Sequence, residues 1–249
     1  MQKSFAVTGP AELEVRLNSG EIEIEAVDDA TSVDVELIAY DEESQLLVDE
    51  ARVELREHHG RPQVVVDVPQ KRSGFSLGNL FSRQGISCRV RCPEGSLLTT
   101  RTRSADLLVR GAIGGMNIAT ASGDVEADRV LGGVNVNTAS GDVRIGSADD
   151  NVTVSTVSGD QEHGAVMRGN VSAHSVSGDV HIGVRRGSKV FLDCSTVSGD
   201  TSSELEVSPE APATDGPLVE IRAKTVSGDI RIARAPAPTV NEEHQEVHA

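Results

Sequence analysis

The sequence predicts an all-β fold: a parallel β-helix or β-solenoid of about seven coils with an N-terminal β cap. Three observations predict it. The tripeptide Ser-Gly-Asp recurs at intervals of 18 to 29 residues, and apolar residues alternate on both sides of each copy. The 249 residues include only four Phe, one Tyr and no Trp, so the core must be built from strand-forming aliphatic residues. A period near 20 is typical of solenoids, whose coils bury their apolar faces against one another.

Six complete copies of the tripeptide and one degenerate copy define the coils. The complete copies are Ser122-Gly123-Asp124, Ser140-Gly141-Asp142, Ser158-Gly159-Asp160, Ser177-Gly178-Asp179, Ser198-Gly199-Asp200 and Ser227-Gly228-Asp229. In the degenerate copy, Ser104-Ala105-Asp106, alanine replaces glycine. Residues 97–234 are therefore predicted to form the solenoid, with each coil hydrogen-bonded to the next about 4.8 Å away.

Aligned positions within the repeat predict two strands separated by a corner. The residues six and four before each serine are apolar or small, and the residue two before it is always Thr or Ser. Such alternate positions share one face of a strand. After the corner, the first and third residues following Asp are mostly apolar. The pairs Gln161/His163 and Thr201/Ser203 break this rule, so those two coils are expected to be wider, exposed or irregular there.

The chemistry of the tripeptide fits a tight corner. Glycine supplies the positive φ that such a corner needs. The Ser and Asp side chains can bond to nearby backbone amides. The inward Thr and Ser residues before each corner can form a hydroxyl ladder, satisfied by one another or by the backbone.

Residues 1–96 are predicted to be a β-rich cap, because a solenoid must cover the strand edges at its ends. Within this cap, residues 42–59 are ambiguous and fit a short helix that passes into a strand. A Pro-rich insertion at 202–217 accounts for the longest interval between corners. Residues 235–249, rich in Pro and Glu, are predicted to be a disordered tail.

Composition limits the partners and the compartment. The net charge of −16 disfavours nucleic acid and anionic membrane surfaces as partners, although residues 61–110 carry a net charge of +6. No run approaches the roughly 18 apolar residues of a membrane helix, and the N-terminus lacks a secretory apolar region, so a cytoplasmic protein without membrane insertion is expected. Cys88 and Cys92, four residues apart in a predicted strand, would lie about 13 Å apart, and reduced thiols are expected.

The file of corner aspartates is one candidate site. Stacked about 5 Å apart, Asp124, Asp142, Asp160 and Asp179 could form a weak Ca²⁺ ladder, since Ca²⁺ takes several oxygen ligands. The favoured alternative is that each Asp caps its own corner in a solvated file. No metal, cofactor or catalytic residue is otherwise predicted, because the histidines lack metal-ligand spacing and no nucleophile or phosphate-loop motif occurs.

The loop at residues 71–85 is a second candidate site. It holds Phe75, Leu77, Leu80 and Phe81 between basic residues, so it could dock a partner. The favoured alternative is a flap over the open edge of the first coil.

A third candidate comprises the alternating arginines Arg89, Arg91, Arg101 and Arg103. They should share an outward face and could bind an anionic partner. The favoured alternative is that they pair with Glu21, Glu23 and Glu25 of the cap.

The segments "LNSGEIEIEA" and "CRVRCPEGSLL", together with the repeated "TASGDV" and "TVSGDI", resemble a bacterial "putative adhesin" β-strand-repeat family, a domain of unknown function. The resemblance covers roughly residues 5–234 and implies a β-solenoid. It implies no catalytic residues, because none are established for that family.

The sequence therefore predicts a non-enzymatic structural or binding module, an adhesin-like solenoid that presents a repetitive surface to an unidentified protein partner. A monomer or weak homo-oligomer is expected. Two alternatives remain open: a carbohydrate-active β-helix enzyme, disfavoured by the scarcity of aromatic platforms for sugar rings, and a self-assembling scaffold of cytoskeletal type.

Overall fold

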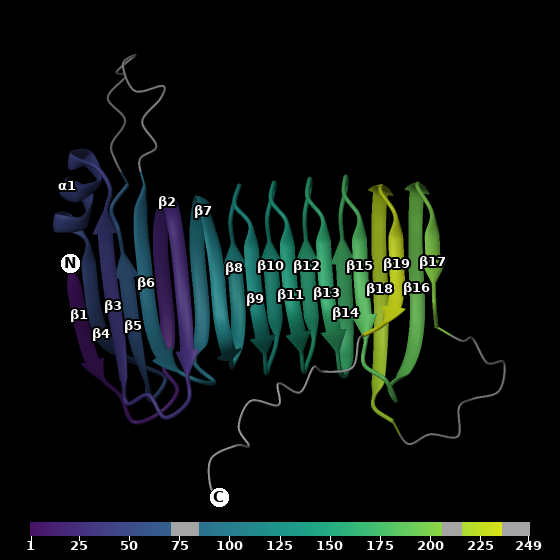
Figure 1. The fold of residues 1–249 in the computed structure, drawn as a ribbon, viewed down its shortest axis with the longest axis horizontal. Coiled ribbons are helices and arrows are strands. Elements are labelled where there is room, and N and C mark those ends of the chain that lie inside the picture. Colours follow the sequence, from purple (N-terminus) through teal and green to yellow (C-terminus); the bar gives the residue numbers. More distant parts are fainter. Residues whose placement is uncertain (71–84, 206–215, 236–249) are drawn as a thin grey trace, which may run out of the picture.

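The protein is a flattened parallel β-solenoid, seen in a computed structural model that describes residues 1–70, 85–205 and 216–235 (Figure 1). Each coil contributes one strand to a first face, a corner, and one strand to a second face. The first face contains the parallel strands β8 (Gly115–Ala119), β10 (Val134–Asn137), β12 (Val152–Ser155) and β14 (Gly169–His174). The second contains β9 (Val125–Val130), β11 (Val143–Ala148), β13 (Gln161–Val166) and β15 (Val180–Val184). The predicted fold class is confirmed.

The interior is a set of vertical files of matched side chains. One file runs through Met116, Val134, Val152 and Val171, which are register partners on neighbouring strands and are all buried. The outward residues between them are polar and exposed, so the alternation read from the sequence sets which side of each strand faces the core.

The parallel stack begins before residue 97. The long strand β2 (Glu12–Val27) lies parallel and in register with β7 (Leu97–Ile113), and Ser19 stands opposite Ser104. Beyond β2, β5 (Arg61–Asp67) and β6 (Ile86–Pro93) pair in parallel with its first and second halves. Residues that the sequence placed in the cap thus contribute to the parallel column, since Ser19-Gly20-Glu21 takes the place of a corner tripeptide.

Antiparallel strands and one helix close the N-terminal end. The strand β3 (Ser32–Ala39) pairs antiparallel with β1 (Gln2–Ala6) and β6, and β4 (Arg52–His58) pairs antiparallel with β5. The helix α1 (Glu42–Glu50) is capped by Asp41, whose Oδ1 accepts a hydrogen bond from the Ser44 amide at 2.7 Å, and it buries Val48. The expected helix passing into a strand at residues 42–59 is confirmed.

The coils do not stack in sequence order at the C-terminal end. The strand β18 (Leu218–Ser227) lies between β14 and β16 (Lys189–Ser198), and β19 (Ile230–Arg234) lies between β15 and β17 (Thr201–Ser203). The last coil in the sequence is therefore inserted before the penultimate one (Figure 1). The prediction that each coil bonds the next in sequence is wrong here.

Burial explains this exchange. The inward residues of the inserted coil are apolar and buried: Ile221, Ala223, Ile230 and Ile232. In the terminal coil, Leu192 and Cys194 are half-buried, and Thr201 and Ser203 are exposed. The more apolar coil is covered on both sides, and the coil with polar inward positions meets solvent, as terminal repeats of solenoids require.

The coil that contains Gln161 and His163 is irregular but not exposed. Both residues are 1% exposed, so exposure, one of the three expected alternatives, does not apply to this coil. A register shift separates His163 from Val166 in the pairing with β15. Burial lowers the pKa of His163 to about 4, and neither of its ring nitrogens has a hydrogen-bond partner in the described structure.

All three cysteines are free, and Cys88 and Cys92 are buried. Burial raises the pKa of the Cys88 thiol to about 12 and that of Cys92 to about 11. These two thiols therefore stay protonated and behave as small core residues.

The coil order can be tested by comparing Ile221→Ala with Leu192→Ala. Ile221 lies between Val171 and Leu192. Ile221→Ala should lower the free energy of unfolding of the protein by about 2–5 kcal/mol, whereas Leu192→Ala, at a half-buried position, should lower it by about half as much or less. Urea unfolding measures both. A sequential stack would place Leu192 inside and Ile221 at the end, so the opposite ranking contradicts the observed order.

His163 should make stability depend on pH. Its folded pKa lies below the unfolded value of 6.5, so its contribution is complete above pH 6.5 and is lost as the pH falls toward 4. The loss between pH 8 and pH 5 should be about 2 kcal/mol. His163→Ile, which matches its register partners Ile145 and Ile182, should remove this component in denaturant titrations at both pH values. Identical pH dependence in the two proteins would exclude His163 as the source.

Candidate binding groove

The Ser-Gly-Asp corner is held by a repeated hydrogen-bond pattern between coils. At one step, the Gly123 amide donates to the Ser140 carbonyl at 3.1 Å and the Val125 amide donates to the Asp142 carbonyl at 2.9 Å. The Asp142 amide donates instead to the Asp124 carboxylate Oδ1 at 2.8 Å. An aspartate side chain therefore supplies one rung of the ladder at the corner.

This bond recurs at every step between the seven aspartate corners. Each carboxylate Oδ1 accepts the amide of the aspartate in the next coil at 2.8–3.0 Å, in the spatial order Asp106, Asp124, Asp142, Asp160, Asp179, Asp229 and Asp200. The expectation that each Asp caps its own corner is wrong, because the amide it caps belongs to the neighbouring coil. Within the described residues no group of three or more His, Cys, Asp or Glu is placed to hold a metal ion.

Glycine is required at the corner for two reasons. Gly141 has a φ of 135°, and a Cβ there would lie 2.3 Å from the Gly123 carbonyl oxygen.

The hydroxyl residue two positions before the corner serine also closes the corner, since Thr138 Oγ1 donates to the Ser140 carbonyl at 3.1 Å. In the next coil Thr156 Oγ1 lies 3.4 Å from the Gly159 carbonyl and also bonds to Ser175 Oγ at 3.1 Å. The expected hydroxyl ladder therefore forms only in part.

In the six complete copies, the residue before the corner serine is apolar and exposed, a feature that the sequence reasoning missed. In spatial order this file comprises Ala121, Ala139, Val157, Val176, Val226 and Val197. Val157 is 53% exposed and Val197 is 82% exposed. The alternation in "TASGD" and "TVSGD" contains this signal, because the position between an inward Thr and the corner must point outward.

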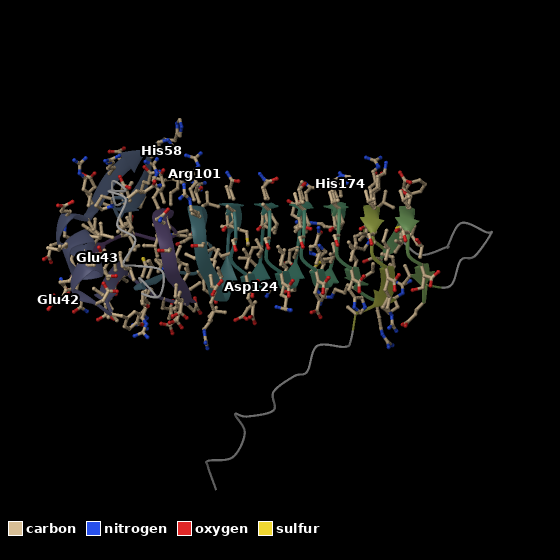
Figure 2. All side chains as sticks on the ribbon, turned by 90° about the horizontal axis from the view of Figure 1, so that it is seen from above. Glu42, Glu43, His58, Arg101, Asp124 and His174 are labelled. Atoms are coloured by element: carbon tan, nitrogen blue, oxygen red, sulfur yellow. The ribbon has the colours of Figure 1, made fainter. Side chains whose placement is uncertain are left out.

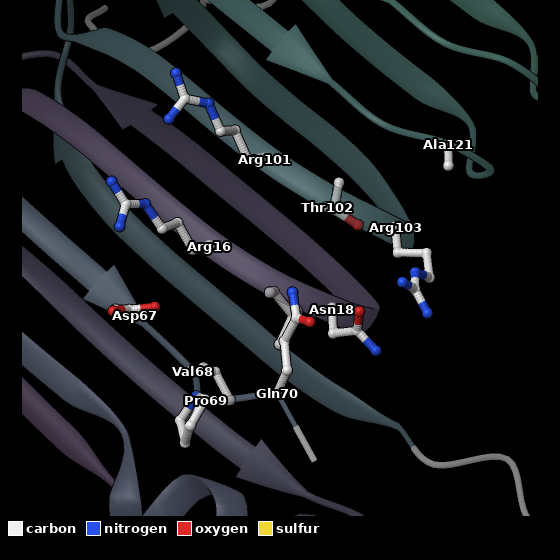
Figure 3. A pocket seen from close by; sticks show the side chains of 11 residues that line it. Arg16, Asn18, Asp67, Val68, Pro69, Gln70, Arg101, Thr102, Arg103 and Ala121 are labelled. Carbon is white, nitrogen blue, oxygen red and sulfur yellow. The ribbon is translucent and has the colours of Figure 1, made fainter. Parts of the chain in front are cut away.

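A groove runs beside this file on the first face. It consists of two hollows of about 520 and 490 Å³ that share Arg101, Thr102 and Ala121. The first hollow reaches to Arg16, Asn18 and Asp67 (Figure 3), and the second reaches to Asn137, Ser155 and Val157. The groove therefore crosses the strands from β5 to β12.

One end of the groove is basic. Arg16 and Arg101 are register partners on β2 and β7, and Arg103 lies near the corner (Figure 3). Arg101 shares the first face with His174 four strands away (Figure 2). The Oδ1 of Asn18, which also lines this end, is buried and has no hydrogen-bond partner in the described structure.

The expected pairing of four arginines with the Glu-rich strand is correct for two of them. Arg89 and Arg91 contact Glu23 and Glu25 at 3.3 and 3.8 Å on the second face. Arg101 and Arg103 precede the corner at Ser104 and so lie on the first face, where neither has an ion pair within the described residues.

The candidate docking residues Phe75, Leu77, Leu80 and Phe81 lie outside the described residues. The described segment that leads to them ends at Gln70, which lines the groove beside Pro69 (Figure 3). No helix in the described ranges is long and apolar enough to cross a membrane.

The chain matches one family model and is similar to solved structures. The family model described as Toastrack DUF4097 matches residues 8–247. A solved "putative adhesin" of Bacteroides fragilis is similar with a TM-score of 0.56 at 13% identity, covering 93% of this chain and 96% of that one. A "putative cell adhesion protein" of Clostridium sporogenes is similar with a TM-score of 0.46 at 12% identity, covering 94% and 99%. No curated protein matches.

The aspartate rung can be tested with Asp142→Ala. The Asp160 amide would lose its acceptor at 3.0 Å, and the unfolding free energy should fall by about 1–3 kcal/mol. Asp142→Asn retains a side-chain oxygen and should recover most of this loss. Thermal melts of each protein test the rung. The same melts repeated with Ca²⁺ and with chelator test the calcium hypothesis. If Asp142→Ala melts like the parent protein, the side-chain rung contributes no stability.

Proposed function

Because the chain belongs to the Toastrack DUF4097 family, we propose that it is a non-enzymatic binding module that presents its repetitive corner edge to a protein partner. The observation that supports this binding role is the groove beside the exposed apolar file. The groove continues across several coils, and Ala121 and Val157 of the exposed file line it.

The chemistry of this edge supports recognition of a polypeptide. Exposed Val157, Val176 and Val226 offer apolar contact at regular intervals. Beside them, Thr120 and Asn137 line the groove with hydroxyl and amide groups, which can bond to a peptide backbone. The wall is part of a column whose aspartate corners are joined by these rungs, so little ordering is needed when a partner binds.

Site-specific photo-crosslinking tests the proposal. A benzoylphenylalanine at Val157, on the rim, should form an adduct with one defined partner in the native host, and the same residue at Ala121 should capture the same partner. At Glu126, an exposed position on the second face, it should not.

Unlabelled protein should suppress the adduct, and unlabelled protein carrying Val157→Asp and Val176→Asp should suppress it poorly. Adducts of equal yield from Val157 and Glu126, or equal suppression by the two competitors, would contradict a binding role for the groove.

A further inference from the structure

We propose that the basic end of the groove binds carboxylate groups of an extended acidic peptide, a ligand class that rests on the proposed function and makes it specific. Arg16, Arg101 and Arg103 border the first hollow, and Asp67 is the one acidic residue that lines it among the described residues. This end is therefore locally positive on a chain with a net charge of −16.

The arginines differ in how far they are already neutralised. Arg16 contacts Glu14 at 2.5 Å. Arg101 and Arg103 are exposed and have no ion pair within the described ranges, whereas Arg110 on the second face contacts Glu23 at 3.4 Å. Two guanidinium groups thus remain available, and their planar donor forks match the geometry of carboxylates.

The second hollow offers polar groups to a peptide backbone. Thr120, Asn137 and Ser155 line it with hydroxyl and amide groups. Such groups both donate to and accept from the N–H and C=O groups of an extended chain.

The dimensions and the remaining lining define the rest of the ligand. Five strand-to-strand steps separate β5 from β12 in the stack, which corresponds to about 24 Å and to about seven residues of extended chain. Beyond Arg101 the lining is uncharged and includes Thr120, Asn137 and Ser155. Acidic residues should therefore occupy one end of the segment, and short neutral side chains the other.

A long polyanion fits less well. The aspartate file that includes Asp124 and Asp142 follows the same corners on their second-face side, and its carboxylates are partly or fully exposed. A uniformly charged strand of nucleic acid or acidic polysaccharide would extend past the arginines along this file and be repelled.

The test uses the full chain and a fluorescein-labelled heptapeptide with three carboxylates at one end and Ser, Thr and Val at the other. Fluorescence anisotropy should show binding that weakens at least 10-fold in Arg101→Glu/Arg103→Glu. The matched control Arg222→Glu/Arg231→Glu reverses two charges outside the groove and should change the affinity less than 2-fold. A twin peptide with Gln and Asn in place of the acids should bind at least 10-fold more weakly than the acidic one.

Equal binding of the two peptides, or equal losses in the two double variants, would overturn the inference. Tighter binding of a single-stranded oligonucleotide or an oligogalacturonate than of the acidic peptide would also overturn it. The outcome is separable from the proposed function. A crosslinked partner at Val157 with no acidic-peptide binding leaves the module intact and removes only its ligand class, whereas peptide binding without crosslinks removes the proposed partner role.

Discussion

The hydrogen bond from one corner amide to the aspartate of the preceding coil is the interaction on which the column depends. A corner tight enough for a flat solenoid turns one amide away from the carbonyls of the neighbouring coil. An unpaired backbone donor destabilises the fold. Asp124 Oδ1 reaches the Asp142 amide at 2.8 Å and fills this position. The close approach that results leaves no space for a Cβ at Gly141. The complete corners therefore repeat both residue types, whereas the corner at Ser104 has Ala105 in place of glycine and the corner at Ser19 has Glu21 in place of aspartate. The links between corners are free to vary in length.

Much of this architecture could be predicted from the residues, because alternation and the corner motif depend on local chemistry. Coil order could not, because the corners at Ser198 and Ser227 are equivalent in sequence and either coil could pair with the one at Ser177. The choice is made by burial, since Ile230 and Ile232 gain more from coverage on both sides than Thr201 and Ser203 do. The place of β2 was missed for a similar reason. Alternating residues around Ser19-Gly20 fit a hairpin and a parallel coil equally well, and only the partner strand distinguishes them.

The candidate site was predictable in composition but not in placement. The arginines were visible in the sequence, yet Arg101 and Arg103 were expected beside Glu23 and Glu25. The corner at Ser104 separates them, because residues before a corner lie on the first face and residues after it lie on the second. Position relative to the corner therefore decides which charges can meet. Spacing along the chain does not.

The same corner explains why a binding surface can vary without disturbing the fold. The residue before each serine points outward and takes no part in the rung, so Ala or Val is accepted in the complete copies and Arg103 is accepted before Ser104. Ala121 stands where the two hollows of the groove meet, next to Arg103, whose carbonyl accepts the Ala121 amide at 3.2 Å, and Val157 stands at the far limit of the second hollow. A small side chain leaves room beside the arginines, and a larger one narrows the groove. Substitution at this one repeat position could therefore alter the shape of the groove from coil to coil, while the buried files and the aspartate rungs keep the column unchanged.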